Sequence, residues 1–99
     1  MKATEINPEQ LERCATMLKA IAHPTRIAII ELLGKQERLT VTEIYEQLGL
    51  EQAVASHHLS ILKNKDVLTS VREGKNVLYE LKYKRIQNVI ECVQNCQDH

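Results

Sequence analysis

Small polar side chains recur at helical spacing between residues 52 and 64. When residues are placed about 100° apart around a helix, Ala55, His58, Leu59 and Leu62 share one side, which we expect to face the core, with His58 as a hydrogen-bonded structural residue. The opposite side holds Ala53, Ser56, His57, Ser60, Lys63 and Asn64, with Gln52 at its boundary. Glutamine can bond the edge of adenine, serine and histidine can meet base edges or phosphates, and lysine binds phosphate. These types suit a helix in the major groove of DNA, and they also suit an ordinary solvent-facing side.

The other reactive side chains are three cysteines, Cys14, Cys92 and Cys96, together with His99. Cys92 and Cys96 are four residues apart and would share one side of a helix. Thiolates bind As(III) and other thiophilic ions, and a histidine could contribute to a zinc site. The same thiols could instead be oxidised. The alternative is that Cys14 is a small core residue and the other two have no role, so the effector stays open.

Composition limits the class of protein. The 99 residues predict one domain, 1–99, with 43% apolar and 26% charged residues and no net charge. Residues 57–85 nevertheless hold seven basic and three acidic side chains, a local charge of +4 that suits either a DNA-binding surface or a solvated lysine-rich face. The apolar runs are too short to cross a bilayer and no secretory signal begins the chain, so we expect a cytoplasmic protein with reduced thiols. Catalytic and phosphate-loop motifs are missing from the sequence, and we therefore expect no enzyme activity.

The first half of the chain predicts two helices. Asn7-Pro8-Glu9 has the order of an N-cap, a first-position proline and an acid facing the helix dipole. His23-Pro24 should interrupt this helix, because proline disfavours helical geometry in the preceding residue. A second, mostly buried helix should run from about Thr25 to Leu33 and stop at Gly34.

The second half predicts two further helices, a hairpin and a last helix. Thr40-Val41-Thr42-Glu43 is a capping box for a helix that ends at Gly49, and the 52–64 helix follows after a short turn. Strands over 68–73 and 76–81 should then form a β-hairpin. A terminal helix carries the apolar stripe Ile86, Val89, Ile90 and Val93. The resulting order, α-α-α-α-β-β-α, is a helix-turn-helix followed by a wing.

Three segments of the chain carry a family resemblance. They are AIAHPTRIAIIELL over 20–33, QAVASHHLSIL over 52–62 and VREGKNVLYEL over 71–81. In this order they resemble the ArsR/SmtB family of bacterial winged-helix repressors, over nearly the whole chain. The resemblance implies a mainly α (α+β) winged helix-turn-helix that pairs its first and last helices into a homodimer and binds an inverted-repeat DNA operator. It also implies that Arg72, Lys75 and Asn76 lie along the flanking backbone or minor groove.

The family's sensor motifs are only partly present. Thr40-Val41-Thr42 stands where arsenite and cadmium sensors carry Cys-Val-Cys, and Tyr83 and Arg85 replace the first zinc-ligand pair. Cys96 and His99 align with the second pair, and Cys14 would face the dimer seam near the last helix. A thiophilic metal or metalloid, thiol oxidation and the absence of an effector therefore remain alternatives. A different reading of the whole chain is a winged-helix protein–protein interaction module, which should carry apolar anchors on the 52–64 helix.

Overall fold

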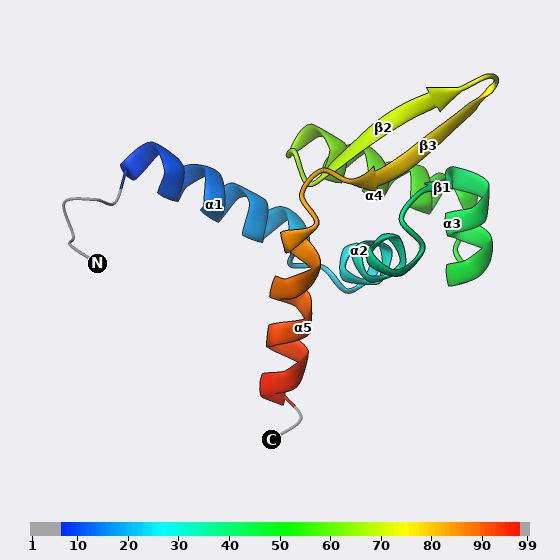
Figure 1. Ribbon diagram of the computed structural model, residues 1–99. Coiled ribbons are helices and arrows are strands. Elements are labelled where there is room, and N and C mark those ends of the chain that lie inside the picture. Colours follow the sequence, from blue (N-terminus) through cyan, green and yellow to red (C-terminus); the bar gives the residue numbers. More distant parts are fainter. Residues whose placement is uncertain (1–6, 98–99) are drawn as a thin grey trace.

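A computed structural model describes residues 7–97 of the chain, except for the side chains of residues 94, 96 and 97. It contains five helices and a three-stranded sheet (Figure 1). The elements are α1 Pro8–Ile21, α2 Pro24–Gln36, β1 Leu39–Thr40, α3 Val41–Leu48, α4 Gln52–Asn64, β2 Leu68–Glu73, β3 Asn76–Leu81 and α5 Arg85–Gln97. The predicted winged helix-turn-helix is confirmed, with one short additional strand, β1.

The helix starts follow the local capping chemistry of the sequence. The Asn7 side chain accepts a hydrogen bond from the Glu9 backbone N–H at 2.9 Å, which begins α1. The Thr40 hydroxyl accepts from the Glu43 N–H at 3.2 Å, and the Glu43 carboxylate accepts from the Thr40 N–H at 2.9 Å. Both bonds of the predicted capping box are therefore present at the start of α3.

Gly34 does not stop α2, and that prediction is wrong. The helix continues to Gln36, and Glu37 follows it with a positive φ of 66°. A Cβ at position 34 would collide with the end of the Gln87 side chain on α5. The glycine therefore lies inside the helix because α5 approaches α2 there, and helices tolerate an interior glycine at a cost of about 1 kcal/mol.

The sheet is antiparallel in the order β1-β3-β2. Leu39 and Thr40 in β1 lie opposite Tyr79 and Leu78 in β3. Strand β1 was not predicted from the sequence, because two residues give no alternating pattern. This pairing places the start of α3 beside the wing.

The core lies where α2, α3, α4 and the base of the sheet meet. Its fully buried side chains are Ile29, Ile30, Leu33, Ile44, Leu59, Leu62, Val67 and Leu68. Ile29, Ile30 and Leu33 belong to α2, which confirms the prediction that this helix is mostly buried on its inner side.

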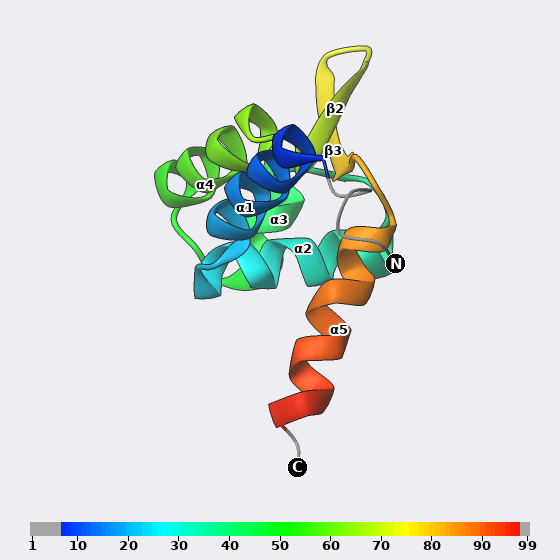
Figure 2. The same cartoon turned by 90° about the vertical axis from the view of Figure 1, so that its left-hand side faces the viewer.

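Helices α1 and α5 project away from this core in different directions (Figures 1 and 2). Each is buried on only a few residues: Ala20 and Ile21 at the end of α1, and Ile86 and Ile90 on α5. None of the helices between residues 7 and 97 is long and apolar enough to cross a membrane.

Candidate nucleic-acid interface

Helix α4 has the two sides that its sequence predicts. Ala55, His58, Leu59 and Leu62 are buried. The other side is exposed and holds Gln52, Ala53, Ser56, His57, Ser60, Lys63 and Asn64. Val54 is also exposed, at 39%, and is the large apolar side chain that interrupts this polar surface. The predicted surface therefore exists as one continuous side of a helix.

The turn between α3 and α4 presents the start of α4 to solvent. Gly49 adopts the left-handed conformation at φ 66°, and the Leu50 N–H donates to the Tyr45 carbonyl at 2.9 Å, which closes α3. Glu51, at the N-cap of α4, makes no side-chain capping bond. The positive end of the α4 dipole therefore lies at an exposed turn beside Gln52.

His58 is the buried polar residue of α4, and it is hydrogen-bonded as the sequence predicts. Its Nδ1 accepts from the Arg26 Nε at 3.1 Å, and the centroid of its ring lies 4.6 Å from that of the His23 ring. Burial lowers the pKa of His58, and the charges of His23, Arg26 and His57 lower it further. The imidazole is consequently held in its neutral form.

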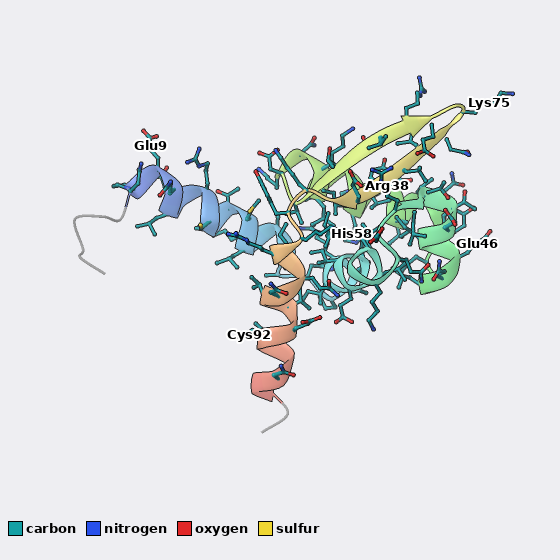
Figure 3. The ribbon with its side chains drawn as sticks, viewed as in Figure 1. Glu9, Arg38, Glu46, His58, Lys75 and Cys92 are labelled. Carbon is teal, nitrogen blue, oxygen red and sulfur yellow. The ribbon has the colours of Figure 1, made fainter. Side chains whose placement is uncertain are left out.

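The wing extends past the end of the helical body, with Lys75 near its tip (Figure 3). Strands β2 and β3 pair along their whole length, from Leu68 opposite Leu81 to Glu73 opposite Asn76, and Gly74 has a φ of 61° in the turn between them. Arg72, Lys75 and Asn76 are exposed. The predicted hairpin is therefore confirmed, with its basic side chains accessible from solvent.

Arg38, which the sequence analysis did not single out, joins the segment before β1 to the wing. Its Nε donates to the Glu80 Oε2 at 2.7 Å, and its Nη1 lies 3.6 Å from the Glu73 Oε1. The hydrogen bond and the charge of Glu80 raise the pKa of Arg38. Exposed pairs of this kind add little stability, but the guanidinium offsets the negative charge of two wing carboxylates.

The cysteines that the structure describes lie on the projecting helices. Cys14 on α1 and Cys92 on α5 are both exposed free thiols (Figure 3). The interpretation of Cys14 as a core residue is therefore wrong for a single subunit. The Cys96 side chain and His99 lie outside the described part of the chain. Among the residues that are described, no group of three His, Cys, Asp or Glu side chains is placed to hold a metal ion.

Comparison with known proteins gives consistent matches. The model of the family "Bacterial regulatory protein, arsR family" matches residues 23–70. The chain is 33% identical over 85 residues to the uncharacterized HTH-type transcriptional regulator MJ1325 of Methanocaldococcus jannaschii, covering 86% of this chain and 96% of that protein. It is 34% identical over 87 residues to the transcriptional repressor PagR of Bacillus anthracis, covering 88% of this chain and 87% of that protein.

Solved structures give the same result. The crystal structure of PagR matches with a TM-score of 0.82 at 33% identity, covering 88% of this chain and 99% of that chain. The homodimeric winged helix-turn-helix DNA-binding domain of Mb0332 from Mycobacterium bovis matches with a TM-score of 0.81 at 26% identity, covering 99% of this chain and 88% of that chain. The whole described fold, projecting helices included, therefore recurs in transcriptional regulators.

Proposed function

The chain belongs to the arsR family of bacterial regulatory proteins, and on this premise we propose that it represses transcription in the cytoplasm by binding an inverted-repeat operator as a homodimer. Like the matched relatives, it is a transcriptional regulator and not an enzyme. The observation that carries the proposal is the exposed polar side of α4 beside an exposed basic wing.

The proposed contacts divide into two kinds. Gln52, Ala53, Ser56, His57 and Ser60 face the base edges in the major groove, where hydrogen bonds can distinguish base pairs. The other contacts meet the sugar–phosphate backbone or the adjacent minor groove and come from Lys63, Arg72, Lys75 and Asn76. They supply affinity and register without reading the sequence directly.

The proposed dimer uses the exposed apolar residues of the projecting helices. Leu11 and Leu18 on α1 and Val89 and Val93 on α5 are each between 44% and 54% exposed in the single chain. The similar domain of Mb0332 is described as homodimeric. A twofold pair buries the same patch on both subunits and presents two copies of α4, as an inverted-repeat site requires.

Selection of binding sites from a pool of random duplex DNA tests this proposal. We expect recovery of an inverted repeat, and affinity for it that falls steeply as salt is raised. Ser56→Ala or His57→Ala should reduce the preference for the selected site over random DNA by about 1–3 kcal/mol. Lys75→Ala should weaken binding to both DNAs and reduce the slope of log affinity against log salt by about 1.

Lys35→Ala is the matched control for Lys75→Ala, because Lys35 is an exposed lysine near the end of α2 and not on the wing. It should bind DNA like the parent. If the parent selects no sequence, or if both α4 variants keep full preference, α4 does not read the operator. On α4, Val54 is the side chain that favours the alternative, a protein-binding module. That alternative would be supported if the parent selected no DNA but bound a protein ligand, and if Val54→Ser abolished this binding.

We further propose that the thiols receive the effector signal. Cys14 and Cys92 are exposed on the helices assigned to the dimer, and thiols respond to thiophilic ions and to oxidants. Cys96 and His99 complete the proposed ligand set. Release of the selected DNA should be tested with As(III), Zn(II) and peroxide. Cys92→Ser and Cys96→Ser should abolish the response while leaving the affinity without effector nearly unchanged, and a parent that responds to none of the three would refute this.

A further inference from the structure

One side chain connects the end of α1 to the middle of α4. The Arg26 Nη1 donates to the Ala20 carbonyl at 3.1 Å, and the Arg26 Nε donates to the His58 Nδ1 at 3.1 Å. Ala20 is in the last turn of α1, where backbone carbonyls have no N–H partner within the helix. His58 is only 8% exposed and Arg26 is half-buried, so both hydrogen bonds are partly shielded from solvent.

The bridge is geometrically demanding. A guanidinium group is planar and rigid, and its donors point in fixed directions, so it fixes two acceptors relative to each other. Arg26 itself extends from α2, which contributes Ile29, Ile30 and Leu33 to the core. The three helices α1, α2 and α4 pack through a shared core, and the two hydrogen bonds of Arg26 add a directional link between the end of α1 and α4.

The two bridged helices carry the two proposed functions of the subunit. Helix α1 bears exposed Leu11 and Leu18 of the proposed dimer surface, and α4 bears the proposed DNA-reading side. The angle between them sets how far apart, and in which orientation, a dimer holds its two copies of α4. Operator half-sites lie about one helical turn of DNA or a multiple of it apart, so this angle determines the spacing that is recognised.

We propose that Arg26 and His58 are positioning residues that set the half-site spacing of the operator, and that the bridge holds only while His58 is neutral. This inference rests on the proposed function, since it requires a DNA-binding dimer. Neither residue needs to touch DNA: Arg26 acts through His58, and His58 acts through the helix to which it belongs.

The protonation state of His58 decides whether the bridge can exist. The Nδ1 lone pair accepts the Arg26 N–H, so the neutral ring carries its proton on Nε2. Protonation at Nδ1 would set two donors against each other and place a cation beside a guanidinium. The groups that act on His58 are Arg26 from α2, His23 from the α1–α2 junction and His57 from α4, and each of them lowers its pKa. The bridge should therefore persist at neutral pH and break on acidification.

The test uses the selected operator with its half-site spacing lengthened or shortened by one base pair. At pH 7.5 the parent should prefer the original spacing by about tenfold or more, since one base pair rotates the half-sites by about a tenth of a turn. Arg26→Met keeps an unbranched apolar stem and removes the guanidinium donors. This variant should bind the three spacings within about threefold of one another, while its affinity for random DNA and its salt dependence stay at the parent's values.

Acidification supplies the second readout. At an acidic pH below the lowered pKa of His58, found by stepping the pH down from 7.5, the parent should lose its preference for the original spacing. His58→Asn keeps an acceptor near the position of Nδ1 and does not titrate, so it should retain the preference at both pH values. Sedimentation at both pH values should show that the protein remains a dimer.

His23→Asn is the matched control. Asparagine is a favoured N-cap and should replace the bond from the His23 Nδ1 to the Thr25 N–H, which is 3.1 Å long. This variant should keep the acid response and shift it to higher pH, because the positive charge of His23 no longer opposes protonation of His58.

The inference is overturned if Arg26→Met, folded as judged by circular dichroism, keeps the tenfold spacing preference. It is equally overturned if His58→Asn loses that preference on acidification as the parent does. Should Arg26→Met fail to fold, the comparison of the parent with His58→Asn decides alone. A parent that binds no DNA at pH 7.5 would instead contradict the proposed function itself.

Discussion

The substitution Val89→Asp should convert the proposed dimer into a folded monomer. Val89 and Val93 are 44% and 54% exposed on α5, whereas Ile86 and Ile90 on the same apolar stripe are 7% and 5% exposed and pack against the core of their own subunit. An aspartate at position 89 therefore leaves the packing of α5 against its own subunit intact. Because Val89 is 44% exposed in the single subunit, the variant should remain folded.

The size of the effect follows from burial and charge. Full burial of a valine is worth about 1.5–3 kcal/mol, and roughly half of the Val89 side chain remains to be buried, which gives about 1 kcal/mol. The twofold axis doubles this loss to about 2 kcal/mol. Each unpartnered carboxylate adds a desolvation cost of at least about 1 kcal/mol. The total of about 4 kcal/mol corresponds to a dimer dissociation constant about a thousandfold higher.

Sedimentation over a range of protein concentrations measures this directly, with circular dichroism to verify folding. Asn95→Asp is the matched control: Asn95 is exposed on α5 two residues after Val93, and hence on nearly the opposite side of the helix. It adds the same charge and should remain dimeric. A Val89→Asp protein that dimerises as tightly as the parent would refute the assignment of the α5 surface, and one that is unfolded would refute the placement of Val89 outside the core.

Three further predictions concern the fold. Thr40→Ala removes the hydroxyl acceptor of the capping box shared with Glu43, and urea titration should show a loss of about 1 kcal/mol in the free energy of unfolding. Gly34→Ala should stabilise α2 by less than about 1 kcal/mol, because the Gln87 side chain must move. When Gly34→Ala is combined with Gln87→Ala, the gain should approach about 1 kcal/mol. A double variant that is no more stable than the parent would contradict the proposed reason for the glycine. The free energy of unfolding should be highest above about pH 6.5, the pKa of an unfolded histidine, and should fall as the pH drops toward the lower pKa of folded His58. This acid loss should be smaller in His58→Asn, and an identical pH profile in the two proteins would show that His58 is not its source.

Much of the fold could be predicted from the sequence because it depends on neighbours along the chain. The N-cap at Asn7, the capping box at Thr40 and the hairpin around Gly74 use residues at most a few positions apart. The two sides of α4 follow from helical periodicity, which also assigned His58 to the interior. These features can be predicted without knowing what packs against them. The exposed residues of the candidate site could therefore be predicted together with the helix on which they lie.

Other features were decided only by tertiary structure. Strand β1 exists because β3 lies beside it, and the space beside Gly34 is filled by the end of the Gln87 side chain from a distant helix. Arg26 and His58 are 32 residues apart in sequence, and nothing in either segment indicates the hydrogen bond that joins them. Such contacts depend on where whole helices come to lie, and that placement is set by burial of the shared core, which leaves no periodic pattern linking the two partners.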